Sequence, residues 1–138
     1  MLTRILTMHT KLFIHRDIKP DNLVTGVGKR HKIIYLIDFG LCKKYWDSKK
    51  EKHLRCRKER KLIGTARFAS INSHNGLDLS RRDDLESFCY VLLYFLKGSL
   101  PWQGISGSTK EKRYRSIGET KASTTPEALF RNLPEEFA

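Results

Sequence analysis

The sequence has 138 residues, of which 39% are apolar and 30% charged, a balance that suits one globular domain or a fragment of a larger one. Lys and Arg number 27 against 15 Asp and Glu, and the net charge of +12 points to an anionic partner: nucleic acid, a membrane surface, or acidic or phosphorylated protein. The longest apolar run, residues 88–96, is too short to span a bilayer, and Arg4, His9 and Lys11 interrupt the apolar N-terminus, which excludes a signal-peptide core. We therefore expect a protein of the cytoplasm, the nucleus or both.

The first forty residues predict a helix, a loop and a strand pair. Apolar residues at roughly helical spacing predict the end of a helix over residues 1–10, and a proline interrupts a loop over residues 13–22. Residues 23–24 and 32–37 are predicted strands, and residues 25–28, which hold two glycines, are the predicted turn between them.

A long basic segment follows the second strand. Residues 42–63 show no apolar periodicity, and eleven Lys or Arg stand against three acidic residues from Lys43 to Arg67. This composition predicts a long loop, functional or disordered. Its charge suits the gathering of negative substrate, and the alternative for most of its residues is a solvated charged loop.

The cysteines and histidines show no metal-ligand pattern. The spacing of Cys42, Cys56 and Cys89 matches no zinc template, so we expect free thiols. Four histidines are interpreted as surface or loop residues: His9, His31, His53 and His74.

The C-terminal half is predicted to be mainly helical. Ser80 as N-cap, two aspartates in the first turn and Gly98 beyond the end predict a strong helix over residues 80–97. Its mostly apolar sides predict a buried pillar. Further helices or helix starts are predicted at residues 110–121, after Thr125 with Pro126 in first position, and at residues 133–136.

Two motifs carry the chemistry. Residues 15–22 read His-Arg-Asp-Ile-Lys-Pro-Asp-Asn, and the triplet Asp38-Phe39-Gly40 follows sixteen residues after Asn22, at the end of an apolar strand. A lone Asp-Phe-Gly triplet is a weak signal. Together, with a strand pair between them, the two motifs fit the pattern H-R-D-x-x-x-x-N followed by D-F-G.

Each motif position suits a chemical task. Asp17 suits acceptance or orientation of the proton of a substrate hydroxyl, and Lys19 suits neutralisation of charge on a transferring phosphoryl group. Asn22 and Asp38 offer the hard oxygen ligands that Mg²⁺ prefers. Gly40 permits a backbone turn that a residue with a side chain resists.

These strings resemble the protein kinase superfamily, and three further strings, residues 64–72, 80–87 and 98–104, resemble its casein kinase 1 branch. In most kinases the activation segment ends in Ala-Pro-Glu, whereas this sequence reads Ala-Ser-Ile-Asn at residues 69–72. The resemblance runs over residues 1–138, which we interpret as one partial protein kinase domain. It implies an α+β, protein-kinase-like fold: a mainly helical C-terminal lobe fragment with a short β-hairpin, without the N-terminal lobe.

The resemblance also implies roles for residues outside the two motifs. Thr65 would hydrogen-bond near Asp17 and join the catalytic group. Structural support is implied for three residues: Arg16, Gly40 and Asp84, the last bracing the backbone of the turn at residues 15–17. For Asp84, a first-turn acid favoured by the helix dipole is an equally valid interpretation.

Two arginines are implied to bind a substrate anion. Arg67 and Arg113 occupy positions that the casein kinase 1 branch associates with acidic or phosphorylated substrates, and a guanidinium fork suits phosphate geometrically. We therefore expect acidic or phosphorylated protein substrates as partners. Membrane binding and specific nucleic-acid binding are not expected, since aromatic residues are not interleaved with the basic runs.

The function implied is that of a serine/threonine protein kinase that uses ATP and Mg²⁺ and acts as a monomer. Only sixteen residues precede Asp17, which leaves no room for the Gly-rich loop, strand Lys and helix Glu that hold ATP in kinases. The chain alone is therefore expected to be of doubtful activity, marginally stable and aggregation-prone, whether it is a truncated gene model or a real short product. The alternative is a non-catalytic kinase fragment or pseudokinase-like protein-binding module.

Overall fold

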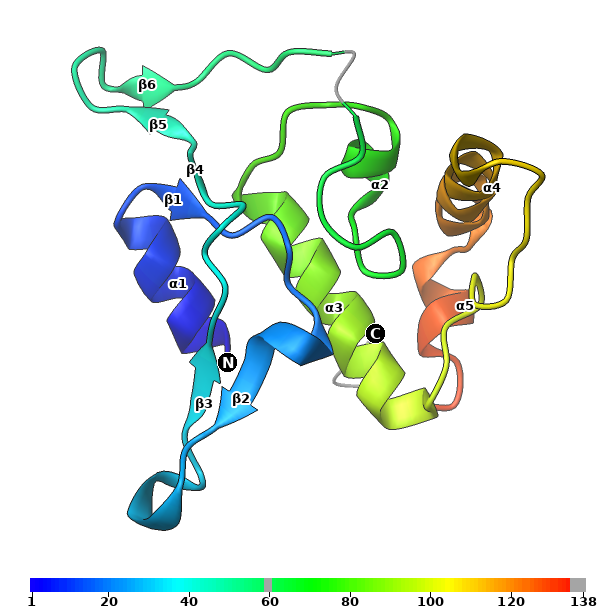
Figure 1. The fold of residues 1–138 in the computed structure, drawn as a ribbon, viewed down its shortest axis with the longest axis horizontal. Coiled ribbons are helices and arrows are strands. Elements are labelled where there is room, and N and C mark those ends of the chain that lie inside the picture. The colour runs from blue at the N-terminus through cyan, green and yellow to red at the C-terminus, as the bar shows by residue number, and fades with distance from the viewer. Residues whose placement is uncertain (59–60, 135–138) are drawn as a thin grey trace.

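The computed structural model of the protein describes residues 1–58 and 61–134. These residues form five α-helices and six short strands arranged around the long helix α3 (Arg81–Lys97). Helix α1 (Leu2–Thr10) lies on one side of α3, and α4 (Lys110–Ser123) and α5 (Pro126–Phe130) lie on the other (Figure 1). The predicted mixture of helix and strand is therefore confirmed.

The strands pair into three separate antiparallel sheets of two strands each. The pairs are β1 (Phe13–Ile14) with β4 (Lys43–Lys44), β2 (Leu23–Thr25) with β3 (Ile34–Leu36), and β5 (Trp46–Asp47) with β6 (Lys52–His53). The hairpin β2–β3 confirms the predicted strand pair, although its connection continues past the predicted turn into a 3₁₀ turn at Gly28–Arg30. The β1–β4 pair joins the chain just before the His-Arg-Asp turn to the chain just after the Asp-Phe-Gly triplet.

The prediction of one long loop over residues 42–63 is wrong in part, because β4, β5 and β6 lie within it. The turn between β5 and β6 is closed by Asp47, whose carboxylate accepts the backbone N–H groups of Lys49 (3.0 Å) and Lys50 (3.2 Å). Strands of two residues are too short to show an alternating pattern, so the sequence carries no periodic signal for them.

Two other short elements also differ from the predictions. Strand β1 lies within the predicted loop over residues 13–22. Helix α2 (Ile71–His74) was not predicted; it starts after Ser70, whose side chain accepts the N–H of Ser73. Four residues make one turn of helix, which is too little for a hydrophobic period to appear.

Helix α3 begins and ends where its sequence predicts. The N–H of Ser80 donates to the carboxylate of Asp83 (2.6 Å), and Gly98 ends the helix with φ 74°, a left-handed conformation that glycine adopts without steric cost. The predictions for the starts of α4 and α5 are also confirmed: Thr125 accepts the N–H of Ala128 as N-cap, with Pro126 in the first turn. Residues 135–136 of the last predicted helix start lie outside the described residues.

One face of α3 forms the core, and the opposite face is exposed. Buried residues of the core come from six segments: Ile5, Ile18, Phe68, Phe88, Tyr90, Val91, Leu93, Trp102 and Ile117. In contrast, Phe95 is 60% exposed and Leu96 is 50% exposed, so the predicted buried pillar is covered on one side only. The three cysteines are free. Among the described residues no helix has the length and apolarity needed to cross a membrane.

The start of α3 is tied to α2 by a buried carboxylate. Asp83 is 3% exposed, and its Oδ1 accepts from Ser70 Oγ (2.8 Å) and Asn72 Nδ2 (2.9 Å), while its Oδ2 accepts from the N–H of Ser80. One side chain therefore both caps α3 and fixes the residues that open α2.

We expect Asp83→Ala to lower the free energy of unfolding by about 2–4 kcal/mol, because it leaves buried donors without an acceptor. Urea denaturation measures this loss. Glu111 is the matched control, because it is an exposed acid in the first turn of α4, and Glu111→Ala should change stability by less than about 0.5 kcal/mol. Equal losses in the two variants would contradict the role given to Asp83.

Candidate active site

The turn that carries Asp17 is held from α3. The carboxylate of Asp84, which is 1% exposed, accepts the backbone N–H groups of His15 (2.8 Å) and Arg16 (2.9 Å). Arg16 has φ 70°, a conformation that a non-glycine residue keeps only when its surroundings enforce it. The hydrogen bonds expected between Asp84 and this turn are thus present, and they stabilise a strained backbone.

Asp84 also binds His9, which sequence reasoning placed on the surface. His9 is 6% exposed, and its Nε2 lies 2.8 Å from Asp84 Oδ2. The interpretation of His9 as a surface residue is therefore wrong. The available signal was its place four residues after Ile5, on the buried face of α1.

Asp17 lies in a cluster with Lys19 and Thr65. Its Oδ1 accepts from both the N–H and the Oγ1 of Thr65 (2.9 Å each), and its Oδ2 is paired with Lys19 Nζ (2.7 Å). Lys19 Nζ also donates to Thr65 Oγ1 (3.3 Å), and its hydrogen bond with Asp17 raises the pKa of Lys19. The structure therefore brings together the three residues that were predicted to be catalytic.

Asn22 and Asp38 lie next to each other through the β2–β3 hairpin. The carbonyl of Asn22 accepts the N–H of Ile37 (3.0 Å), the residue before Asp38, while Asn22 Nδ2 donates to the carbonyl of Asp17 (2.8 Å). Asp38 is exposed at the surface, and its Oδ1 accepts the N–H of Gly40 (3.2 Å). An amide oxygen and an exposed carboxylate at the two ends of this hairpin are chemically suited to Mg²⁺, which retains waters and binds substrate phosphates. Among the described residues no group of three or more His, Cys, Asp or Glu could hold a metal by itself.

Gly40 does not form the special backbone turn that was expected of it. The residue of the triplet with a left-handed backbone is Asp38, with φ 63°, and not Gly40. A Cβ on Gly40 would lie 3.2 Å from Asp38 Oδ1, so a side chain there would crowd the carboxylate that accepts its N–H. Gly40 thus supports the site through close approach.

Arg16 and His15 join the Asp17 turn to the Asp-Phe-Gly triplet. Arg16 Nε donates to the carbonyl of Leu41 (2.6 Å), and burial lowers the pKa of Arg16. His15 is fully buried, with Nε2 3.1 Å from the carbonyl of Ile37 and its ring edge-on to Phe39 at 5.6 Å. The support expected from Arg16 therefore takes the form of a contact across the site, and His15 is a second contact that was not predicted.

Arg67 and Arg113 line one open cleft of about 840 Å³, with Thr65 and Asp21 among the other lining residues. Both arginines are exposed, and Arg113 stacks over Tyr114 at 5.6 Å. Within the part of the chain that the structure describes, Asp21 is the single acidic residue of the lining. The cleft therefore combines two guanidinium groups with the hydroxyl that binds Asp17, although the two arginines are 46 positions apart in the sequence.

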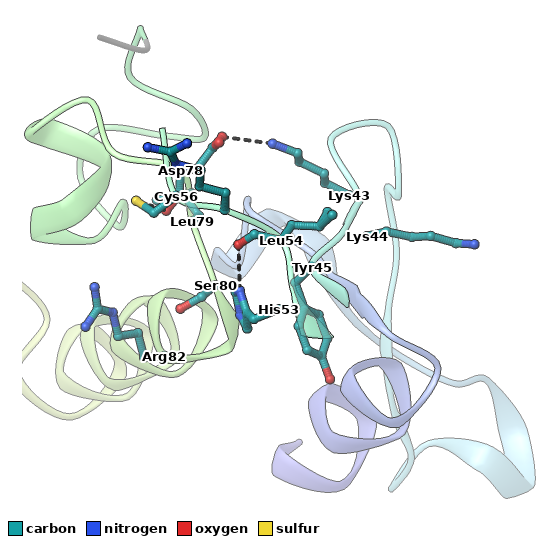
Figure 2. A pocket seen from close by; sticks show the side chains of 11 residues that line it. Lys43, Lys44, Tyr45, His53, Leu54, Cys56, Asp78, Leu79, Ser80 and Arg82 are labelled. Carbon is teal, nitrogen blue, oxygen red and sulfur yellow. Dashed lines mark hydrogen bonds and ion pairs between the residues drawn. The ribbon is translucent and has the colours of Figure 1, made fainter. Parts of the chain in front are cut away.

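A second hollow lies between the β5–β6 hairpin and the start of α3 and holds none of the predicted site residues. It has a volume of about 260 Å³ and is lined by Lys43, His53, Cys56 and Asp78, among others (Figure 2). Lys43 Nζ is paired with Asp78 at 2.8 Å, and the Lys44 side chain points away from the hollow (Figure 2). Its basic residues thus belong to a different surface from the Arg67 cleft.

Gly64 permits the contact between Thr65 and Asp17. It has φ 84°, and a Cβ there would lie 2.5 Å from the carbonyl oxygen of Arg16. We expect Gly64→Ala to cost about 3 kcal/mol, from left-handed strain and a clash with backbone. Gly98→Ala is the control, because Gly98 has φ 74° and nothing within 4 Å of its Cβ position, so that strain alone should cost about 1 kcal/mol. Chemical denaturation compares the two, and equal costs would show that the close approach does not matter.

The sequence matches a model of the protein kinase domain over residues 1–135. The matched range includes the Asp17 cluster, the Asp38 triplet and both arginines of the cleft. The prediction from the two motifs is therefore confirmed at the level of the superfamily. Since the match spans nearly the whole sequence and the fold brings the motif residues together, this chain belongs to the protein kinase domain family.

Proposed function

We propose that this kinase is a serine/threonine protein kinase of the casein kinase 1 type, which transfers the γ-phosphoryl group of ATP to Ser or Thr in acidic or phosphorylated proteins. The observation that supports this most directly is the adjacency of the Asp17 cluster and the arginine cleft, which share Thr65. A substrate with an anionic group in the cleft would have its hydroxyl near Asp17.

The hydrogen bonds of Asp17 suit a proton acceptor. Thr65 and Lys19 together orient both oxygens of the carboxylate. In the proposed transfer the substrate hydroxyl oxygen bonds to the γ-phosphorus, the bond from the γ-phosphorus to the bridging oxygen breaks, and ADP carries away that oxygen. The hydroxyl proton passes to Asp17, and Lys19 offsets negative charge on the phosphoryl group.

ATP and Mg²⁺ are the cofactors proposed. Asn22 and Asp38 would hold Mg²⁺, which neutralises charge between the β- and γ-phosphates when bound. The described residues correspond to the larger, mainly helical lobe of a kinase in this proposal. The parts that hold ATP from the opposite side are not among the 138 residues, so the proposed activity is that of a complete kinase.

Specificity would come from Arg67 and Arg113. Guanidinium groups bind phosphate and carboxylate through paired hydrogen bonds, and they remain charged at all physiological pH values. The net charge of +12 would add long-range attraction for acidic partners. We propose acidic or phosphorylated proteins as the partners, a monomeric state, and a site of action in the cytoplasm, the nucleus or both.

A second candidate function is phosphoprotein binding without catalysis. It is favoured by the arginine cleft, in which both guanidinium groups are exposed and available to a ligand. The two functions differ in one respect that can be measured, since only the kinase depends on the carboxylate of Asp17.

The first test replaces Asp17 with Asn in the complete kinase, with the parts that hold ATP present, and measures transfer of labelled γ-phosphoryl to an acidic peptide. We expect transfer to fall by at least about 10³-fold while phosphopeptide binding is retained, because only the proton acceptor is lost. Asp47→Asn, in the β5–β6 hairpin, is the control and should leave transfer unchanged. Full activity of Asp17→Asn would refute the kinase assignment, and wild-type binding without any transfer would favour the second candidate.

The second test replaces Arg67 and Arg113 with Ala, singly, and measures the affinity for a phosphoserine peptide by fluorescence anisotropy. Each substitution should weaken binding by about tenfold, because a charge-assisted hydrogen bond to phosphate is lost. Arg115→Ala is the matched control, since Arg115 is exposed on the same helix as Arg113 but does not line the cleft. Equal weakening in all three variants would mean that net charge, rather than this cleft, binds the peptide.

A further inference from the structure

A lysine with no role in the site described above is buried near the end of α4. Lys121 is 1% exposed, and its Nζ donates to the carbonyl oxygens of Ala66 (3.0 Å) and Ala69 (2.5 Å). The amine also lies over the rings of Tyr90 (4.7 Å) and Trp102 (5.0 Å). Burying a cation is costly unless such partners replace water, so the placement points to a specific task.

Two other side chains bind the same stretch of backbone. Trp102 Nε1 donates to the carbonyl of Arg67 (2.7 Å), and His74 Nε2 lies 3.1 Å from the carbonyl of Ala66. His74 Nδ1 lies 2.9 Å from the carbonyl of Tyr114 in α4. His74 is half-buried at the end of α2, so its interpretation as a surface or loop residue is wrong in part. We call Lys121 and Trp102 the carbonyl clamp, because the neutral His74 has a single N–H for the two carbonyls of Ala66 and Tyr114.

The clamped stretch, residues 65–69, links the two parts of the candidate site. At its start, Thr65 binds Asp17, and two positions later Arg67 lines the anion cleft. The carbonyl of Thr65 also accepts the N–H groups of Phe68 (2.8 Å) and Ala69 (2.9 Å), which makes the stretch a tight turn. Because peptide units are planar, fixing three carbonyls in this turn fixes where Thr65 and Arg67 lie.

We propose that Lys121 is a positioning residue, which holds residues 65–69 so that Thr65 meets Asp17 and Arg67 faces the cleft shared with Arg113. The importance of this for substrate binding rests on the proposed function of the cleft. The hold on the backbone itself does not.

The charges around Lys121 make the stability of the turn at residues 65–69 depend on pH, and this dependence can be measured. Burial lowers the pKa of Lys121 to about 7, and Glu86 on α3 opposes this. The other titratable groups that face it are Tyr90 on α3, whose pKa is raised by burial, and His74 on α2, whose pKa is lowered to about 4 by burial and by Lys121. Neither carries charge between pH 6 and pH 9. The clamped carbonyls and the indole of Trp102 carry no titratable group.

The direction of the pH effect follows from proton linkage. When residues 65–69 open, Lys121 reaches water and its pKa returns towards the ordinary value of 10.5. Between about pH 7 and that value the open form binds one more proton than the closed form, so the closed form gains stability as the pH rises. Below about pH 7 both forms carry the proton, and opening has no such pH dependence.

Hydrogen exchange of the Phe68 and Ala69 amides, detected by NMR and corrected for the intrinsic exchange rate, tests the proposal in the wild-type chain. Protection should rise about fiftyfold between pH 7 and pH 9, because the open form binds close to one more proton over most of this range. The Ile37 amide, which bonds to Asn22 in the hairpin, is the internal reference and should not follow this profile. A flat profile at Phe68 and Ala69 would overturn the proposal, because the turn would then open without moving Lys121.

The variant Lys121→Met removes the amine that donates to the carbonyls of Ala66 and Ala69. We expect protection of Phe68 and Ala69 to fall about tenfold at pH 8 and to lose its rise with pH, whereas Lys112→Met, an exposed lysine of the same helix, should match the wild type. Unchanged protection in a folded Lys121→Met variant would overturn the proposal. If this variant does not fold, the wild-type profile decides.

Binding of a phosphoserine peptide then tests whether the contacts of Lys121 with residues 65–69 affect the arginine cleft. Lys121→Met should lower the affinity for the peptide about tenfold at pH 8, and Lys112→Met should leave it unchanged. If the wild type binds no phosphopeptide while the exchange profile is as expected, the proposed anion binding by the arginine cleft is refuted, and the role of Lys121 in holding residues 65–69 stands. If the wild type binds and Lys121→Met binds equally well, positioning of Arg67 by Lys121 is refuted.

Discussion

The buried carboxylate of Asp84 is the interaction on which the site depends. It satisfies the backbone N–H groups of His15 and Arg16 and the ring of His9, and it does so from the first turn of α3. A turn with Arg16 in the left-handed region would relax without partners of this kind. An acceptor at a helix start suits the task, because the helix dipole also favours its negative charge. Through this one side chain, α3 fixes the position of the turn that carries Asp17.

Asp83 and Asp84 lie in the same turn of α3 and bind different segments. Asp84 binds the turn before Asp17, whereas Asp83 binds the residues that open α2. Residues 65–69 immediately precede the residues that Asp83 binds. They contact Asp17 through Thr65 and line the arginine cleft through Arg67. The basic side chains of this region differ in their exposure. Arg67 and Arg113 are exposed and suited to a ligand, while Lys121 is buried and donates its hydrogen bonds to backbone carbonyls. Proximity to the site therefore does not by itself indicate contact with substrate.

The sequence by itself determined those features whose information lies within a few neighbouring positions. The capping residue Ser80 and the glycine at position 98 define the ends of α3 because caps act over one helical turn. The order of His-Arg-Asp, hairpin and Asp-Phe-Gly put Asn22 and Asp38 at the two ends of one strand pair, and a hairpin necessarily brings its two ends together. The family itself followed from these motifs.

Only the tertiary structure decided the contacts that join distant segments. Arg67 and Arg113 line the same cleft because α2 and α4 pack together, and nothing in the local sequence of either arginine encodes that packing. The two-residue strands exist only through their partners. His9 and Lys121 look like solvent-exposed residues in the sequence, yet the structure buries both, because a polar side chain can leave water wherever other segments supply its hydrogen-bond partners. Local composition determines propensity and capping, whereas burial and pairing depend on which segments the whole chain brings together.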